Sequence, residues 1–207
     1  MCEKAYEKKA GLDRELFVQR VQIFLPSYTF SPLHTNMNDG GPIVVVEQCK
    51  GKTAKGERCK RRSQKSGMCW THLAKEQGLK IKKSQIPGAG DGLYATKEWN
   101  RGNNITEYGG DRVELDNNGN DVRTGQPWRS QYGLQIKKHP LTFIDARKTN
   151  SAPGRYANTA RGSEFRNNAQ LVYDRNGRKA HVRAAQRIEP NQEIFVPYGN
   201  SFHFSRS

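Results

Sequence analysis

The chain has 207 residues, a hydrophobic content of 34% and a formal net charge of +15 at pH 7. Its apolar runs are short, so we expect no membrane-spanning helix, and its first residues lack the charged-then-apolar pattern of a secretory signal. The absence of long apolar helical stripes argues against a helical bundle and favours short strands joined by turns. We expect an intracellular protein with one domain of ordinary size and a small additional module.

The first segment, residues 1–45, has no clear periodic pattern. Residues 15–25 suit a helix or a strand equally well, and Pro26, Pro32 and the Asn/Gly-rich run 36–42 interrupt any regular element. We therefore predict a poorly ordered arm over residues 1–45, a small module over 46–78 and a main domain over 80–207.

The positive charge is concentrated in the small module and just after it. Between Cys49 and Lys83 there are 12 Lys or Arg residues and 2 Glu residues, a net charge of +10 out of the total of +15. Such a segment attracts nucleic acid or another polyanion in a salt-dependent way. A surface that only keeps the protein soluble is the alternative interpretation.

The same segment contains three of the four cysteines, namely Cys49, Cys59 and Cys69, with His72 close behind. Three sulfurs and one imidazole nitrogen suit a closed, tetrahedral Zn²⁺ site of the structural kind. A segment this polar buries little apolar surface, so a metal can supply its folding free energy. The alternatives are free cysteines in a basic loop, or a disulfide, which a reducing compartment disfavours.

In the main domain, short apolar segments alternate with turns. The turn at 174–177, which contains Asn-Gly, is a strong hairpin signal because Asn and Gly readily adopt positive φ. One helix is expected near Asp111 to Gln126. The predicted fold class is mainly β, with strands at residues 92–95, 104–108, 132–136, 142–146, 170–173, 180–184 and 193–196.

Four pieces in this domain occur in a recognisable order. They are residues 86–95 (IPGAGDGLYA), 154–158 (GRYAN), 167–169 (NNA) and 193–199 (EIFVPYG). Together they resemble the SET domain, the fold of protein-lysine methyltransferases, and the likeness covers residues 84–204. The resemblance implies a β-clip fold of short strands with a knot-like C-terminal segment.

The resemblance also implies a binding site for S-adenosylmethionine. It places Gly90, Asp91, Gly92 and Leu93 against the cofactor, because a glycine turn lets the main chain approach a ligand closely. On its own this turn is equally that of a plain hairpin. Asn158 matches the family's cofactor-binding asparagine. Asn168, or its neighbour Asn167, matches the second asparagine, which lies near the cofactor and the knotted segment.

The chain departs from the family pattern beside these residues. Thr159, which we also predict to contact the cofactor, and Ala160 stand where His and Ser are usual. The loop between the two asparagines is longer than usual, and Pro197 stands where Asp usually precedes the catalytic tyrosine.

Tyr198 matches that catalytic tyrosine and is also predicted to touch the cofactor. Tyr108, in the run Glu107-Tyr108-Gly109, matches a second tyrosine that lines the lysine channel; a half-buried strand tyrosine is the alternative interpretation. Val196 stands where the family varies the residue that limits methyl number. Because no cysteine follows Cys69 to build a C-terminal zinc site, we expect Phe202 and Phe204 to wall the channel, a frayed end being the alternative.

The sequence therefore predicts an S-adenosylmethionine-dependent protein-lysine N-methyltransferase with a structural Zn²⁺ module. A histone is the expected substrate, with a non-histone protein as the alternative, and the nucleus is the expected location, with the cytoplasm as the alternative. The basic residues 49–83 are expected to contact nucleic acid. The competing hypothesis is a catalytically inactive SET-fold zinc protein that binds nucleic acid or chromatin.

Overall fold

A computed structural model describes residues 40–174 and 178–198 of the chain. The predicted aromatic tail, Phe202 and Phe204, and most of the predicted arm lie outside these residues. Within the described part the fold is mainly β, as predicted. In chain order its elements are β1 (Glu47–Gln48), β2 (Arg62–Ser63), α1 (Trp70–Gln77), β3 (Leu79–Lys83), β4 (Asp91–Ala95), β5 (Asn104–Tyr108), β6 (Asp111–Leu115), β7 (Gly133–Lys138), β8 (Leu141–Asp145), the 3-10 helix η1 (Pro153–Tyr156), β9 (Ala169–Tyr173) and β10 (Ala180–Ala184).

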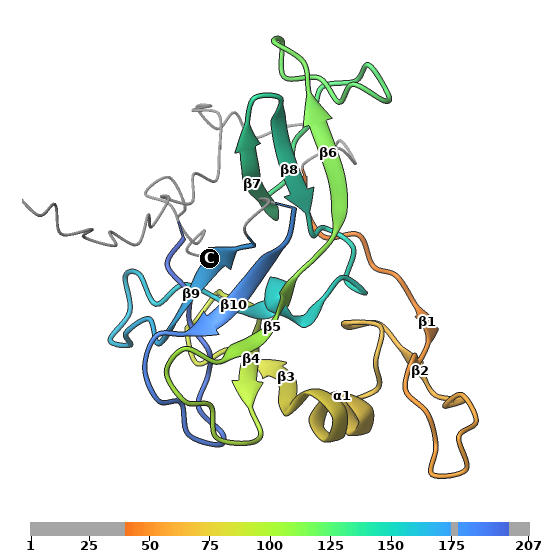
Figure 1. Cartoon of the computed structure of the whole chain (residues 1–207), viewed down its shortest axis with the longest axis vertical. Coiled ribbons are helices and arrows are strands. Elements are labelled where there is room, and N and C mark those ends of the chain that lie inside the picture. Colours follow the sequence, from red (N-terminus) through yellow and green to blue (C-terminus); the bar gives the residue numbers. More distant parts are fainter. Residues whose placement is uncertain (1–39, 175–177, 199–207) are drawn as a thin grey trace, which may run out of the picture.

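The strands form small antiparallel sheets rather than one large sheet. Their orders are β1-β2, β3-β4, β5-β10-β9 and β6-β8-β7. Figure 1 shows β6, β7 and β8 at one end of the molecule and α1 near the other, with β5, β9 and β10 between them. The pairing of β9 with β10 confirms the predicted hairpin.

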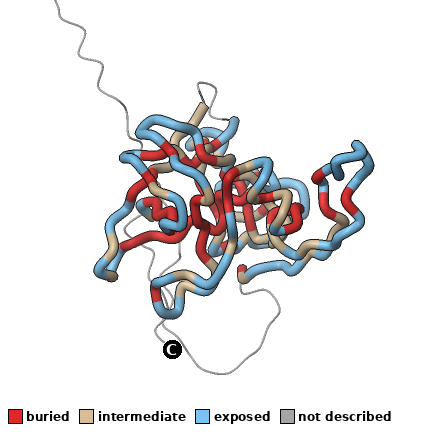
Figure 2. Tube along the Cα trace, turned by 90° about the horizontal axis from the view of Figure 1, so that it is seen from below, coloured by how far each residue is buried: buried red, intermediate tan, exposed pale blue. Residues whose placement is uncertain are grey.

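Side-chain alternation explains the position of the core. In β10 every second residue is buried, and Val182 has no exposed surface. Its apolar face packs with Leu93 of β4 and with Ile194 and Val196. Figure 2 shows the buried segments gathered in the middle of the molecule, with exposed loops around them.

The small module leads directly into the main sheet system. Helix α1 is capped by Gly78, whose N–H bonds the carbonyls of Leu73 and Ala74 and whose φ of +67° turns the chain out of the helix. Strand β3 begins at the next residue and pairs with β4 from Leu79↔Ala95 to Lys83↔Asp91. The prediction missed β3, although Leu79 and Ile81 alternate with lysines as in a half-buried strand.

The segment 193–196 does not form a full strand, but it is extended and enclosed on several sides. Ile194 N–H donates to the Leu93 carbonyl (2.7 Å), and Val196 N–H donates to the Asn158 carbonyl (2.8 Å). Ala169 N–H donates to the Phe195 carbonyl (2.9 Å). The segment therefore lies among three parts of the chain that are distant in sequence, in agreement with the expected knot-like C-terminal segment.

The expected helix over Asp111 to Gln126 was wrong. Residues Asp111–Leu115 form β6, in which Val113 pairs with Phe143 of β8. The next residues turn because the Asp116 carboxylate accepts the backbone N–H groups of Asn118 and Asn120 (2.9 and 2.8 Å). Such local side-chain bonds compete with helix formation.

The described end of the predicted arm contacts the main domain. Ile43 N–H donates to the Arg147 carbonyl, and Thr149 N–H donates to the Ile43 carbonyl, both at 2.8 Å. No helix among the described residues is long and apolar enough to cross a membrane.

Candidate functional site

The four predicted metal ligands come together in the structure. The ligand atoms of Cys49, Cys59, Cys69 and His72 all lie within 4.8 Å of one another. The His72 Nδ1 atom is 3.4 Å from the Cys49 sulfur and 3.2 Å from the Cys69 sulfur. In a tetrahedral zinc site with Zn–S bonds of about 2.3 Å, neighbouring ligand atoms are about 3.8 Å apart. The cluster therefore fits a Cys₃His zinc site.

The loop after Cys49 orients the imidazole. His72 Nε2 lies 2.8 Å from the Lys52 carbonyl oxygen, so this nitrogen carries the proton and Nδ1 keeps its lone pair toward the sulfurs. Gly51 makes this approach possible, because a Cβ there would lie 2.4 Å from His72 Cγ.

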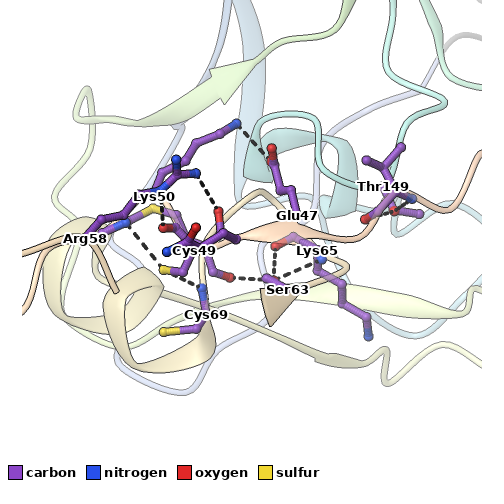
Figure 3. Close-up of polar contacts among 12 residues, drawn as sticks. Glu47, Cys49, Lys50, Arg58, Ser63, Lys65, Cys69 and Thr149 are labelled. Atoms are coloured by element: carbon purple, nitrogen blue, oxygen red, sulfur yellow. Dashed lines mark hydrogen bonds and ion pairs between the residues drawn. The ribbon is translucent and has the colours of Figure 1, made fainter. Parts of the chain in front are cut away.

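The local environment shifts the pKa values of two of these thiols in opposite directions. The backbone N–H groups of Cys69 and Gly51 donate to the Cys49 sulfur (3.1 and 3.4 Å), and Figure 3 shows Cys49 and Cys69 with their polar neighbours. Burial raises the pKa of Cys49. Burial acts in the same direction on Cys69, but hydrogen bonds from the His72 backbone and the neighbouring ligands outweigh it and lower its pKa to about 6. Cys49, Cys59 and Cys69 are all free, so none of them forms a disulfide.

The second group of functional residues surrounds a buried carboxylate, Glu193, whose side chain the sequence analysis did not single out. Glu193 is 2% exposed. Its oxygens accept from the Ser84 hydroxyl (2.7 Å), the Gln85 N–H (2.8 Å) and the Tyr94 hydroxyl (2.8 Å). The Asn158 amide adds a longer bond (3.3 Å). Glu193 could have been identified from the sequence as an acidic residue at the start of an apolar run.

The glycine at position 92 is explained by this carboxylate. A Cβ there would lie 2.1 Å from Glu193 Oε1 and 3.2 Å from the Ser84 Cα. Gly90 differs: its φ is +73°, and a Cβ would meet nothing within 4 Å. Of these two glycines, Gly90 therefore has open space beside it, whereas Gly92 is required by packing within the chain.

The two matched asparagines hold distant segments together. The Asn158 side chain donates to the Asp91 carbonyl (3.0 Å), which ties the loop after η1 to the glycine turn. The Asn168 amide donates to the Glu193 carbonyl (2.8 Å) and accepts from the Phe195 N–H (2.9 Å). Asn167 instead accepts from the Ala160 N–H (2.9 Å) and closes the long loop. Asn168 is thus the asparagine that contacts the enclosed segment.

Of the two candidate catalytic tyrosines, Tyr198 lies close enough to Tyr108 to influence it electrostatically. The Tyr198 hydroxyl donates to the Ala157 carbonyl (2.7 Å), and the Tyr108 hydroxyl donates to the Tyr132 carbonyl (3.0 Å). Burial raises the pKa of both phenols, and the proximity of Tyr198 raises that of Tyr108 further. Both are therefore neutral hydroxyls at physiological pH, suited to orienting an amine by hydrogen bonds.

Arg155 is a neighbour whose side chain the sequence analysis did not single out. It is 6% exposed, and its guanidinium carbon lies 4.4 Å from the Tyr132 ring centroid and 4.5 Å from that of Tyr156. Its Nε donates to the Ala146 carbonyl (2.7 Å), while Nη2 is buried without a hydrogen-bond partner. A buried donor of this kind costs free energy unless a ligand satisfies it. Arg155 could have been identified from the sequence by its place in the family-like run Gly154-Arg155-Tyr156.

The remaining predicted site residues occupy different environments. Thr159 is 1% exposed, and its hydroxyl oxygen lies 3.4 Å from the Tyr198 N–H. Leu93 and Val196 are fully buried in the main core rather than on an open surface. The Asp91 carboxylate forms an ion pair with Lys65 of the small module (2.7 Å), so the module reaches the glycine turn.

Comparison with known families agrees with this arrangement. A family model described as SET domain matches residues 90–199, which is more than half of the chain. This protein therefore belongs to the SET domain family, whose fold is that of protein-lysine methyltransferases. A second family model, a domain of unknown function (DUF5763), matches residues 46–86 and so includes β3 as well as the cysteine cluster.

Among curated proteins, none matches this chain. Solved structures with similarity include the Polycomb Repressive Complex 2 of Chaetomium thermophilum in an autoinhibited apo state, at 22% identity and a TM-score of 0.47. The same complex bound to S-adenosylmethionine matches at 23% identity and a TM-score of 0.47. Each match covers 61% of this chain, which spans only 16% of the Polycomb chain. The methyltransferase domain of human PR domain-containing protein 2 matches at 18% identity and a TM-score of 0.46, over 66% of this chain and 88% of that domain.

Proposed function

We propose that this protein transfers a methyl group from S-adenosylmethionine to a lysine side chain of another protein. The observation that carries the proposal is the pair of neutral tyrosines, the buried Tyr108 and the partly buried Tyr198, within a chain of the SET family. When bound, the cofactor supplies a sulfonium-activated methyl group. The lysine amine forms the new N–C bond as the S–C bond breaks, and the amine proton leaves to solvent.

The tyrosine hydroxyls orient the amine, and their raised pKa values keep them protonated while they do so. The apolar surroundings disfavour the charged form of the lysine and so increase the fraction of free amine at neutral pH. Main-chain carbonyls near the methyl group can accept weak C–H···O contacts from it.

The residues present fit the cofactor at two points. The turn at Gly90 leaves room for a ligand, and the unpartnered Nη2 of Arg155 is a donor for a carboxylate such as that of the cofactor's amino-acid part. We assign cofactor binding to Gly90–Leu93, Asn158, Thr159 and Tyr198, with Gly92 and Leu93 acting through the shape of the turn. Tyr108 and Val196 belong to the lysine channel in this proposal.

The cysteine cluster has a separate role. Zn²⁺ held by Cys49, Cys59, Cys69 and His72 would close the small module and leave no position for a substrate.

We propose a histone as the first substrate to test, and the nucleus as the corresponding location of the protein. The basic segment 49–83 would help such a protein to stay on nucleosomes.

The test is transfer of labelled methyl from S-adenosylmethionine to histones, to nucleosomes and to proteins of a cell extract. Tyr198→Phe and Asn158→Ala should each lower the rate, by about 100-fold if the amine or the cofactor is misplaced by about 1 Å. Tyr156→Phe is the matched control, because the Tyr156 hydroxyl also donates to a backbone carbonyl at 2.7 Å and the variant keeps the ring that lies against Arg155.

Unchanged transfer by Tyr198→Phe would contradict the catalytic assignment. If the wild-type chain bound no cofactor and transferred nothing, the inactive SET-fold zinc protein would be the better description. Methyl transfer to extract proteins but not to histones would support the proposed reaction and contradict the proposed histone substrate.

A further inference from the structure

The small module carries positive charge that the rest of the described chain does not neutralise. Of the 12 basic residues between Cys49 and Lys83, Lys50 and Lys65 form ion pairs, with Glu47 and Asp91. The other ten form no ion pair with any residue that the structure describes. Arg61 and Arg62 are exposed, as are Lys52, Lys55 and Lys60. This surface is therefore open to an anionic partner.

One aromatic side chain stands out from this charged surface. Trp70, the first residue of α1, is 72% exposed, whereas Trp99 is 9% exposed and belongs to the core. Trp70 directly follows Cys69, so the cysteine cluster fixes the backbone that carries the ring. An exposed tryptophan on a rigid, polar module does not help to bury apolar surface within the chain.

An arginine is held over one face of the ring. Arg61 Nη1 donates to the Thr71 hydroxyl at 2.7 Å, and its guanidinium carbon lies 5.8 Å from the Trp70 ring centroid. The hydrogen bond limits the freedom of a long side chain, so less conformational entropy is lost when it binds a ligand. The ring and the guanidinium are thus positioned together before any partner arrives.

From these observations we propose that Trp70 and Arg61 form a binding platform for single-stranded nucleic acid. The indole face stacks on an unpaired base, the Arg61 guanidinium bonds a phosphate, and the surrounding lysines follow the backbone. A duplex hides its base faces within the stack, which leaves no partner for Trp70. The stacking residue therefore selects single strands, while charge alone would bind both forms.

Fluorescence anisotropy of the full chain with a labelled 20-nucleotide single strand, and with a duplex of the same length, tests this proposal without the methyl donor. The single strand should bind more tightly. Trp70→Ala should weaken its binding by at least about fivefold while leaving duplex binding unchanged. Arg61→Gln should lower the slope of log affinity against log salt by about 0.7. Lys138→Gln is the matched control, since it removes an exposed charge on β7, outside the small module.

Tryptophan emission gives a second readout. Binding of the single strand should quench the emission of the wild-type chain, and Trp70→Phe should abolish the quenching because Trp99 and Trp128 are not on the platform. Zinc content and circular dichroism, unchanged in the variants, show that the module is still folded. Equal affinity for single strand and duplex, no effect of Trp70→Ala, or no binding at all would each overturn the proposal, whatever the outcome for methyl transfer.

Discussion

The small basic module and the SET part of this chain are stabilised in different ways. In the module, residues 46–78, the only strands are the two-residue β1 and β2, and four ligand atoms meet at one point. In the SET part, sheets and a buried carboxylate join segments that are about 100 residues apart, as in the Ser84–Glu193 bond. Yet Cys49 and Leu73 lie in the same apolar cluster as Val182 and Ile194. One core therefore serves two regions, and the cysteine cluster that fits a zinc site lies in the module.

Removing the metal should have the largest effect and should fall mainly on the module. Structural zinc contributes on the order of 10 kcal/mol to folding in isolated zinc-finger peptides. Cys69→Ser should therefore abolish stoichiometric zinc, measured by metal analysis, and expose the amides of α1 to hydrogen exchange. Cys2→Ser is the control, because Cys2 is outside the predicted ligand set. Full zinc content in Cys69→Ser would contradict the assignment.

Removing the buried carboxylate should damage the SET part and spare the metal. Glu193→Ala leaves the Ser84 hydroxyl and the Gln85 N–H without their acceptor, while the Tyr94 hydroxyl keeps the Lys83 carbonyl at 2.9 Å. We expect the free energy of unfolding to fall by about 3 kcal/mol or more, measured by urea denaturation. Glu114→Ala, at an exposed position of β6, should change it by less than about 0.5 kcal/mol. Equal losses in the two variants would show that Glu193 has no special structural role.

Alkaline pH should weaken the same part of the structure through Tyr94. Burial, followed by the Glu193 carboxylate, raises the pKa of Tyr94 to about 12, against about 10 for an unfolded tyrosine. The unfolded chain therefore loses this proton first, so the contribution to stability is complete below pH of about 10 and is lost as the pH rises toward 12. Urea denaturation between pH 8 and 12 should show a shallower decline for Tyr94→Phe than for the wild type. Parallel curves would reject this linkage.

The smallest effect on affinity and stability is expected at the contact between the small module and the SET part. The Lys65–Asp91 pair is partly exposed, with 42% and 25% of the side-chain surfaces accessible, so it is worth at most about 1 kcal/mol. If the proposed cofactor site is right, Lys65→Gln should weaken S-adenosylmethionine binding by no more than about fivefold, with little change in melting temperature. Lys50→Gln, which breaks the Lys50–Glu47 pair inside the module, should leave the affinity unchanged. Calorimetry of cofactor binding measures the affinity of both variants, Lys65→Gln and Lys50→Gln.

Much of the fold could be predicted because its signals are local. Strand β5 was expected at residues 104–108 and lies at Asn104–Tyr108, since Ile105, Thr106 and Tyr108 favour a strand and a turn precedes it. The Cys₃His cluster was also predictable, because few residue types bind zinc and four of them occur within 24 positions. The expected helix after Asp111 failed because nothing nearby in sequence shows that Val113 pairs with Phe143.

The sequence by itself thus determined the mainly β class, the family likeness and the identity of the cysteine cluster, since these depend on residue type and spacing. Only the tertiary structure decided why Gly92 must be glycine, which asparagine contacts the enclosed segment, and where the small module meets the glycine turn. Each of these depends on atoms that are distant in sequence, as Glu193 is from Gly92 and Lys65 from Asp91. Contacts of this kind are set by how the chain packs, and a linear pattern does not contain them.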